Sequence, residues 1–425
     1  MKILFFTHQY FPRHLGGTEV YLRSIVRRAM AANHECRIIT CHEAPSTSQD
    51  DFHIERIVDE GVPIIEIHFN LSATISPAKA EYDNPFVAKV VSKELEQFHP
   101  ELVHVMHGMK LSGSALRACR LAKVPIIVTL CDYWFLCPRH TLVKWNEVLC
   151  EGPTFPWSCL HCVRDLHQFG VFSKQIGKFI GEIKSIGLRN RILRQELLSA
   201  KRILALSSFQ KEIFVRNGYP EERLEVVSHG LEVEEMGLES PLGDLPDSPS
   251  GIIQIGFIGT LVPFKGAHIL LEAIRRDPTL EVKCFVYGSL LKGPYGERIC
   301  HLAKEDQRIQ LMGTFPPENF GQVLRCFDIL AAPALWYENN PLVVQGALYA
   351  GVPILASQIG SLTDMVKPGI NGWLVKAGDV GAWTEAIRTI CQQGVLRFMP
   401  GSGKTMETNM QELFSIYEKE ARKCS

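Results

Sequence analysis

Short apolar runs separated by helical segments recur along the whole chain, and this alternation limits the folds that it can adopt. In the first half the runs are Lys2–Thr7, Cys36–Thr40, Leu102–Val105, Ile126–Leu130, Ile203–Leu206 and Leu224–Val227. Short, largely apolar runs are typical of parallel strands that are buried on both faces. Residues 1–230 are therefore predicted to form a doubly wound, Rossmann-like α/β domain.

The alternation restarts after a polar segment. Residues 231–251 are rich in Glu, Pro, Gly, Ser and Asp, which is typical of a linker. The runs that follow are Ile252–Ile258, Val282–Tyr287, Ile309–Met312, Ile329–Ala332 and Val352–Ala356. They predict a second Rossmann-like domain over 252–400 and a closing helix within 401–425 that returns to the first domain. Two such domains that face one another form a central cleft at the carboxyl ends of their strands.

Composition sets the broad class of protein. With 425 residues the chain is too long for one ordinary core, and 46% hydrophobic and 21% charged residues are globular values. A formal net charge of −1 gives no general attraction to nucleic acid. No run reaches the ~20 apolar residues of a membrane span, and the N-terminus does not resemble a signal peptide. A cytoplasmic protein is expected, with its 13 cysteines as thiols or metal ligands.

The stretch 333–353 carries the clearest functional pattern. It predicts a strand end, a tight loop with a carboxylate at Glu338, and a helix over 341–350. The backbone N–H groups of Leu342 and Val343 at the helix start suit a phosphate. A carboxylate just before them can accept hydrogen bonds from sugar hydroxyls. The stretch therefore predicts a site for a sugar linked to a diphosphate.

Other candidate residues also follow predicted strands. Lys265 lies between a strand and a helix, where its ammonium group can reach a diphosphate. Gly16 and Gly17 precede a helix and let a ligand approach the backbone closely, although an ordinary turn uses the same residues. His107 follows the run Leu102–Val105, so its imidazole is expected at the cleft, although a single His has many structural uses.

Four cysteines form a separate cluster in the loop 131–165. They are Cys137, Cys150, Cys159 and Cys162, and the last two form a C-x-x-C pair. Four thiolates suit a tetrahedral structural zinc ion, and a long loop with weak secondary-structure patterning needs such a staple. Scattered thiols are the alternative. A closed four-sulfur site leaves no position for substrate, so its role would be structural.

Several segments, taken in their order along the chain, resemble the retaining glycosyltransferases of the GT4 type. They are His8-Gln-Tyr10-Phe-Pro12, Gly16-Gly17-Thr18-Glu19, Pro100-Glu-Leu-Val-His104, Val128-Thr-Leu-Cys-Asp132-Tyr-Trp134, Gly259-Thr-Leu-Val-Pro-Phe-Lys265-Gly266, Gly360-Ser-Leu-Thr-Asp364 and Gly369-Ile-Asn-Gly372. The stretch around Glu338 matches the family's donor motif. The resemblance covers nearly the whole chain and implies the two-domain GT-B fold.

The resemblance also implies roles for individual residues. Glu338 and Asp132 would be catalytic, with Glu338 on the donor sugar. The donor, a UDP-, GDP- or ADP-sugar, would be bound with the help of Asn340 together with the residues named above. The acceptor, a glycan or lipid-linked glycan, would enter near Gly16, Gly17 and Asp132. No D-x-D motif occurs, so no catalytic metal is expected.

Two positions depart from the family pattern. The second glutamate of the donor motif falls at Gly346, and the usual histidine before Asp132 is Cys131. The leading interpretation is a glycosyltransferase of cell-surface polysaccharide biosynthesis. The departures keep open a catalytically impaired protein that binds a glycan or a partner, and a nucleotide-sugar epimerase is a third, disfavoured reading.

Residues 171–194 combine an apolar helical stripe with basic side chains. The basic residues are Lys174, Lys178, Lys184, Arg189, Arg191 and Arg194. Such a helix can lie on an anionic membrane beside a lipid-linked acceptor. A helix packed on its own domain has the same signature and is the favoured reading.

Overall fold

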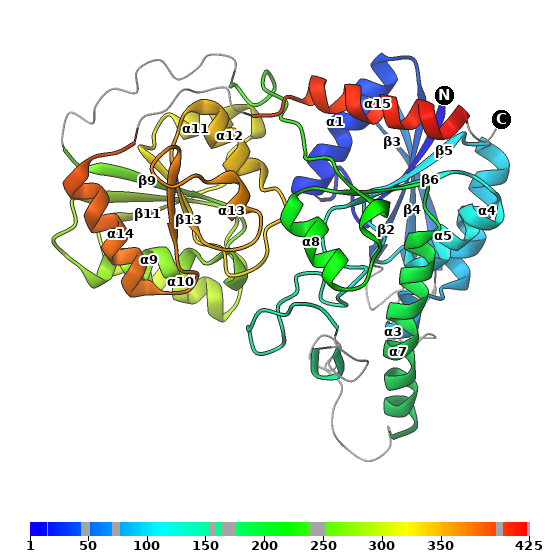
Figure 1. The fold of residues 1–425 in the computed structure, drawn as a ribbon, viewed down its shortest axis with the longest axis horizontal. Helices are drawn as coiled ribbons and strands as arrows, with labels where there is room; N and C mark the ends of the chain where they lie inside the picture. The colour runs from blue at the N-terminus through cyan, green and yellow to red at the C-terminus, as the bar shows by residue number, and fades with distance from the viewer. Residues whose placement is uncertain are drawn as a thin grey trace. The chain divides into compact units, whose positions relative to one another are not determined.

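The computed structural model divides the chain into two compact units. Unit 1 comprises Met1–Val227 and Met410–Ser425, and unit 2 comprises Ser228–Asn409. The residues that the structure describes are 1–14, 16–43, 52–69, 77–153, 159–162, 176–238, 251–396 and 403–422. In each unit a sheet is covered by helices (Figure 1). The predicted fold class, two doubly wound α/β domains, is confirmed.

Unit 1 contains an eight-stranded sheet in the order β3-β4-β2-β1-β5-β6-β7-β8. The strands are β1 (Lys2–Phe6), β2 (Glu35–Glu43), β3 (Phe52–Asp59), β4 (Val62–Phe69), β5 (Leu102–Val105), β6 (Ile126–Leu130), β7 (Arg202–Ala205) and β8 (Leu224–Val226). Only the edge strand β3 runs antiparallel to its neighbour within this sheet. The pair β3 and β4 was missing from the sequence prediction.

The helices of unit 1 follow from caps and apolar stripes. They are α1 (Gly17–Ala31), α3 (Pro77–Ala80), α4 (Pro85–Phe98), α5 (Ser112–Leu121), α7 (Ile176–Leu198), α8 (Ser208–Arg216) and the short η2 (Glu221–Arg223). At the start of α4, the Asn84 side chain accepts hydrogen bonds from the N–H groups of Phe86 and Val87. Pro85 has no N–H to satisfy there, so the sequence fixes this helix start.

Unit 2 contains a six-stranded, entirely parallel sheet in the order β11-β10-β9-β12-β13-β14. The strands are β9 (Ile253–Ile258), β10 (Val282–Tyr287), β11 (Ile309–Gly313), β12 (Ile329–Ala332), β13 (Ile354–Ser357) and β14 (Gly372–Val375). The helices are η3 (Pro263–Lys265), α9 (Ala267–Arg276), α10 (Pro294–Lys304), η4 (Pro317–Asn319), α11 (Phe320–Leu324), α12 (Leu342–Ala350), α13 (Leu362–Met365) and α14 (Val380–Gln393).

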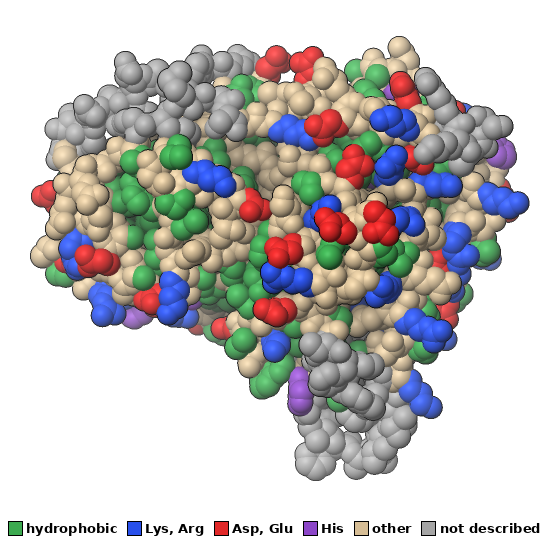
Figure 2. Space-filling view, viewed as in Figure 1, with side chains coloured by type: hydrophobic (Ala, Val, Ile, Leu, Met, Phe, Trp, Pro, Cys, Tyr) green, Lys and Arg blue, Asp and Glu red, His purple; other side chains and the backbone are tan. Residues whose placement is uncertain are grey.

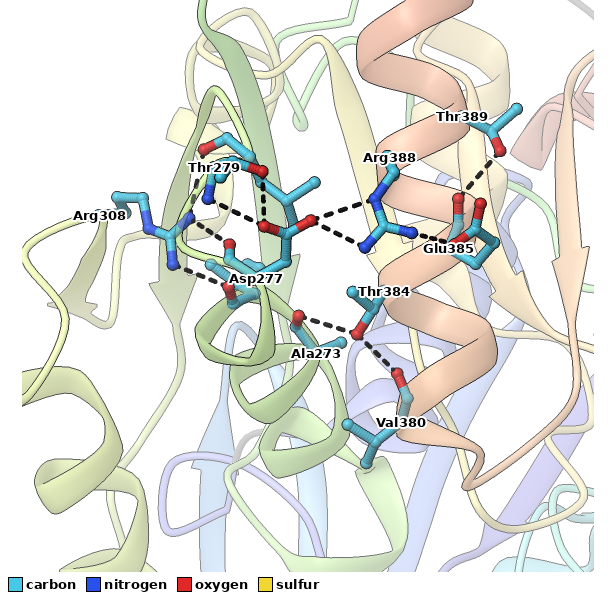
Figure 3. Close-up of polar contacts among 11 residues, drawn as sticks. Ala273, Asp277, Thr279, Arg308, Val380, Thr384, Glu385, Arg388 and Thr389 are labelled. Carbon is cyan, nitrogen blue, oxygen red and sulfur yellow. Dashed lines mark hydrogen bonds and ion pairs between the residues drawn. The ribbon is translucent and has the colours of Figure 1, made fainter.

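A polar network joins the helices on one face of the second sheet (Figure 3). Asp277, which ends α9, accepts hydrogen bonds from the Arg388 guanidinium of α14 at 2.8 and 3.1 Å. Its other carboxylate oxygen accepts from Thr279 Oγ1 at 2.6 Å, and Arg308 donates to its carbonyl at 2.9 Å. The network holds the end of α9 against the middle of α14, and both helices cover the apolar core of this unit.

The last helix, α15 (Met406–Arg422), is red in Figure 1 and begins in unit 2. From Met410 onward it belongs to unit 1, where the Tyr417 hydroxyl lies 2.6 Å from His104 Nδ1 on β5. Within the described part of the chain, no helix has the length and apolar character needed to span a bilayer.

Candidate functional site

Each sheet has one position where its strand order reverses, and ligands of open α/β sheets bind there, beyond the carboxyl ends of the strands. In the second sheet this position lies between β9 and β12. The loops that follow these strands contain Lys265 and Glu338, the two residues predicted to contact a sugar diphosphate. The topology thus brings together side chains that are 73 residues apart in the sequence.

Lys265 and Glu338 form an ion pair, with Nζ 2.5 Å from Oε1. Glu338 is only 7% exposed, and the Lys265 side chain is 28% exposed. The Lys265 ammonium also lies 5.0 Å from the centre of the Trp336 ring, a cation–π contact that holds it in place. Trp336 packs in turn on Phe264. The sequence analysis did not identify Trp336, because one aromatic residue in a loop carries no distinctive signal.

Two glycines allow the loops of this site to approach one another closely. Gly266 has a φ of +74°, and a Cβ there would lie 1.8 Å from the carbonyl oxygen of Pro333. Gly360 has a φ of +59°, and a Cβ there would lie 2.9 Å from the Glu338 backbone nitrogen. The Ser361 N–H donates to the Glu338 carbonyl at 3.0 Å. The backbone around the carboxylate is therefore fixed from both sides.

Helix α12 begins directly after this loop, with Pro341 as its N-cap rather than its first residue. The N–H groups of Val344 and Gln345 both donate to the Pro341 carbonyl. Those of Leu342 and Val343 precede the first helical bond, as expected for an anion-binding helix start. Gln345 donates to the Asn340 side chain.

Buried His229 lies against the backbone of Asn340 and was not predicted. Burial lowers the pKa of His229 to about 3, so the ring is neutral at pH 7. His229 follows the short strand β8, and its contact with Asn340 joins two loops that are more than 100 residues apart in the sequence.

Gly346, where the family has its second glutamate, is enclosed by an aromatic ring. A Cβ at this position would lie 2.3 Å from Cε1 of Phe320, which is 4% exposed. Phe320 begins α11 and is stacked near Phe315, with ring centres 6.4 Å apart. The departure at Gly346 is therefore matched by packing around it, and Phe320 takes the space that a larger side chain would enter.

Unit 1 has a second cluster at its own strand-order reversal, between β1 and β5. His8 follows β1 and His107 follows β5, and their ring centres are 4.0 Å apart. His107 Nε2 lies 2.5 Å from Asp132 Oδ2, at the end of β6. The Met109 N–H donates to His107 Nδ1 at 3.1 Å, so Nδ1 is the acceptor and Nε2–H donates to the carboxylate.

The charges of this cluster are set by burial and pairing. Burial opposes ionisation of Asp132, but its interaction with His107 outweighs burial and holds the pKa of the carboxyl below its usual value. The Trp134 N–H adds a hydrogen bond to Asp132 Oδ1 at 2.8 Å. Burial and the neighbouring His107 lower the pKa of His8 well below its usual value. An ionised carboxylate thus faces neutral His8 across His107.

Gly16 and Gly17 form the exposed start of α1 in the same unit. Glu19, three residues after the cap, is buried, and burial raises the pKa of its carboxyl while hydrogen bonds with the backbone of Glu19 and Gly16 oppose the rise. The contact of Glu19 with the Gly16 backbone is one half of a capping box, because the N-cap glycine has no side chain to supply the other half. Burial also raises the pKa of the Cys131 thiol, which contacts Thr18, so this thiol stays protonated at pH 7.

The four cysteines of the loop lie in the described part of the chain. Cys137, Cys159 and Cys162 are buried and Cys150 is half-buried. Burial raises the pKa of Cys137 to about 12, and Cys159 contributes to the rise, so these two thiols are neighbours. Among the described residues, no three of these four sulfur atoms all lie within 4.8 Å of one another. The zinc site therefore stays a prediction.

Some basic residues of α7, the helix predicted to be basic and amphipathic, contact their own unit instead of solvent. Arg189 is fully buried, is ion-paired with Glu81 and donates to the Trp134 carbonyl at 2.6 Å, so it is not part of a basic surface. Arg194 donates to the Gly218 carbonyl. Lys184 and Arg191 are exposed. Lys174 lies outside the described residues, and the side chain of Lys178 is not described.

The chain has two doubly wound units. In the second unit, the Lys265–Glu338 pair lies beside the start of α12, where the strand order reverses. These features define a protein of the GT-B class. Family models agree over both units. "Glycosyl transferase 4-like domain" matches residues 16–230, and "Glycosyl transferases group 1" matches residues 247–401. The chain belongs to the GT4-type glycosyltransferase family.

Curated relatives match parts of the chain. A D-inositol 3-phosphate glycosyltransferase of Nocardia farcinica is 26% identical over 326 residues, which are 71% of this chain and 62% of the relative. The protein of the same name from Corynebacterium glutamicum is 29% identical over 233 residues, 50% of this chain and 54% of the relative. The chain thus spans less than two thirds of the length of these relatives.

Solved structures match over nearly the full length. HepE of Anabaena, in a complex with UDP and glucose, has a TM-score of 0.62 at 19% identity and covers 98% of this chain and 99% of its own. Sucrose-phosphate synthase of Thermosynechococcus elongatus has a TM-score of 0.63 at 17% identity, with 99% and 96% covered. These likenesses show the shared GT-B fold.

Proposed function

We propose that this protein transfers a sugar from a nucleotide-diphosphate sugar to a hydroxyl group of a glycan or glycolipid, with retention of configuration, in cell-surface polysaccharide biosynthesis. The observation that carries the proposal is the Lys265–Glu338 pair, 2.5 Å apart beside the start of α12. One cation, one carboxylate and free N–H groups are the three kinds of group that a sugar diphosphate needs.

The two members of the pair would act on opposite ends of the donor. Lys265 and the N–H groups of Leu342 and Val343 stabilise the charge that develops on the leaving diphosphate. Glu338, released from Lys265 by the incoming phosphate, accepts hydrogen bonds from the sugar and stabilises positive charge at the anomeric carbon. Because the cation and dipole are built into the protein, the mechanism uses no catalytic metal.

The donor class is supported by a structural neighbour. HepE is described in complexes with UDP and with UDP-glucose. A UDP-sugar is therefore the first donor to test, ahead of GDP- and ADP-sugars. The acceptor would be handled by unit 1, where Asp132 is ionised and aligned by His107, and where Gly16 and Gly17 leave the start of α1 exposed.

A lipid-linked acceptor would place the protein at the cytoplasmic face of a membrane. Lys184, Arg191 and the partly exposed Arg120 are the described basic residues that favour such a contact. Acidic and basic side chains are interspersed on the face shown in Figure 2, so any attraction would be local. Vesicle co-sedimentation with and without anionic lipid tests this part of the proposal.

The central test is a screen for donor binding and sugar transfer with UDP-, GDP- and ADP-sugars. Lys265→Ala should weaken donor binding about tenfold or more, because a charged hydrogen bond contributes about 1.5–3 kcal/mol. Glu338→Gln should lower the transfer rate more than donor affinity. Lys376→Ala, whose side chain is 79% exposed in the same unit, is the matched control. Absence of binding to every donor would contradict the proposal.

A second candidate is an impaired GT-B protein that binds a glycan or a partner. The observation that favours it is Phe320, which closes the space around Gly346. Because of that ring, Gly346→Glu alone would introduce a clash, so the informative variant is Gly346→Glu combined with Phe320→Ala. A large gain in donor binding by the double variant would support the impaired reading. Efficient transfer by the native chain would exclude it.

We also propose the structural zinc ion at Cys137, Cys150, Cys159 and Cys162. Elemental analysis of the purified protein is expected to show that Cys159→Ser loses one equivalent of zinc relative to the native chain. Cys326→Ser, which alters an exposed thiol elsewhere in the chain, is the control. Unchanged zinc content in Cys159→Ser would argue against the site.

A further inference from the structure

Strands β2, β4 and β3 place imidazoles and carboxylates in two adjacent rows of the first sheet. His42, His68 and His53 are direct cross-strand neighbours and form one row. Glu66 and Glu55 are paired two positions along and form the next row. Residues two apart in a strand point to the same face. All five side chains therefore gather on one face, near the edge of the sheet.

Three atoms of this cluster have the spacing of metal ligands. His68 Nε2 lies 3.2 Å from Glu66 Oε2 and 3.3 Å from Glu55 Oε2, and all three atoms lie within 4.8 Å of one another. Nitrogen and oxygen ligands at ~2.0–2.1 Å from a tetrahedral ion are about 3.3 Å apart. In the described ranges, no other group of three His, Cys, Asp or Glu ligand atoms meets this spacing.

The buried carboxylate of Glu66 needs a positive charge beside it. Glu66 is 2% exposed and His68 is 5% exposed, and a buried carboxylate without a counter-charge is costly. Arg13 supplies the positive charge, with Nε 3.1 Å from Glu66 Oε2 and Nη2 3.0 Å from Glu55 Oε2. The Arg13 side chain is 42% exposed, so it can move into solvent when another cation enters.

The surroundings of His68 suit a transition metal. The His53 ring stacks on it with centres 4.4 Å apart, and the His42 ring lies 5.3 Å away. Mixed imidazole and carboxylate donors favour zinc and similar ions over Mg²⁺ or Ca²⁺.

We propose that Glu55, Glu66 and His68 bind a divalent first-row transition-metal ion of the zinc type, which replaces the Arg13 guanidinium between the two carboxylates. The ion would link the edge strand β3 to β4 and release the Arg13 side chain from the sheet. This site is separate from the cysteine cluster and from the groups assigned to sugar transfer.

The test is a Co²⁺ titration of the metal-free, full-length protein, followed by visible and near-ultraviolet absorption. His68→Gln is expected to weaken binding about tenfold or more, because loss of even an outer-shell partner of a metal ligand weakens binding about 10–100-fold. Arg13→Gln is expected to tighten binding several-fold, because it removes the competing cation. His301→Gln, which alters an exposed imidazole on α10, should bind like the native protein.

Opposite effects of the two variants separate metal binding from a folding defect, since a misfolded chain does not bind more tightly. Cobalt at this site gives weak visible bands, whereas cobalt on thiolates adds strong near-ultraviolet absorption, which distinguishes the cysteine cluster. Should Arg13→Gln and His68→Gln both match the native affinity, or should only thiolate-type spectra appear, the proposal is overturned. If His68→Gln does not fold, the comparison of Arg13→Gln with the native protein decides.

Discussion

At the residue scale, each unit holds one nitrogen donor against one carboxylate in the loops that follow its strands. Lys265 and Glu338 meet at 2.5 Å in one unit, and His107 and Asp132 meet at 2.5 Å in the other. In each pair the partners come from two strands that are neighbours only in the folded sheet. The sequence could therefore indicate Lys265, Glu338 and His107 from their places after strands, and the family resemblance indicated Asp132, but neither gave their pairing.

The His107–Asp132 pair is expected to contribute to turnover rather than donor affinity. Loss of a positioned acid–base pair lowers rates about 10²–10⁴-fold. Asp132→Asn and His107→Gln should therefore lower kcat by about a hundredfold or more, with the donor Kd nearly unchanged because Lys265 remains. Steady-state kinetics and isothermal titration calorimetry measure the two quantities. His301→Gln is the control. If donor affinity and kcat fall together, a structural role for the pair is indicated instead.

At the element scale, α12 is packed around the missing side chain of Gly346. Gly346→Ala removes a helix-weakening glycine, a gain of up to about 1 kcal/mol, but it forces a Cβ against Phe320. Overpacking costs about 1–3 kcal/mol, so a net decrease in the free energy of unfolding is expected. Chemical denaturation should show it.

The matched control for Gly346→Ala is Gly381→Ala in α14. The nearest atom to a Cβ at Gly381 is 3.5 Å away, an ordinary contact, so this variant should be as stable as the native protein or slightly more stable. The double variant Gly346→Ala/Phe320→Leu should recover part of the loss through relief of the clash. Equal stability of the Gly346→Ala and Gly381→Ala variants would contradict this account of the helix.

The strands differ in how well the sequence predicts them. Buried parallel strands such as β5, β6 and β12 coincide with the predicted runs, because burial on both faces demands continuous apolar residues. Strands β3 and β4 were missed because β3 alternates exposed and half-buried residues and β4 includes Pro63, Glu66 and His68. The Glu55, Glu66 and His68 cluster was missed for the same reason, since only strand register brings it together.

At the scale of the whole molecule, α15 connects the end of the chain to the centre of the first sheet. His104 on β5 is fully buried, with Nδ1 2.6 Å from the Tyr417 hydroxyl and Nε2 2.8 Å from Thr129 Oγ1. A neutral imidazole matches these two hydroxyls, with one nitrogen donating and the other accepting. A protonated ring would carry an uncompensated buried charge, and burial lowers the pKa of His104 to about 3.

This shift makes the attachment of α15 sensitive to acid. Because the folded-state pKa is below the usual value of about 6.5, the unfolded chain binds the proton more readily. The stabilisation is complete above about pH 6.5 and is lost as the pH falls toward 3, at up to about 1.4 kcal/mol per pH unit. Hydrogen exchange should show α15 amides losing protection between pH 6 and pH 4.

His104→Gln keeps a donor and an acceptor but does not titrate, so its α15 protection should depend much less on pH. His268→Gln is the matched control, since burial also lowers the pKa of His268, to about 4, but this residue lies in unit 2. The control should lose α15 protection with acid as the native chain does. If His104→Gln shows the same loss, acid acts on α15 through other groups, and the His104–Tyr417 contact does not control how the end of the chain is held.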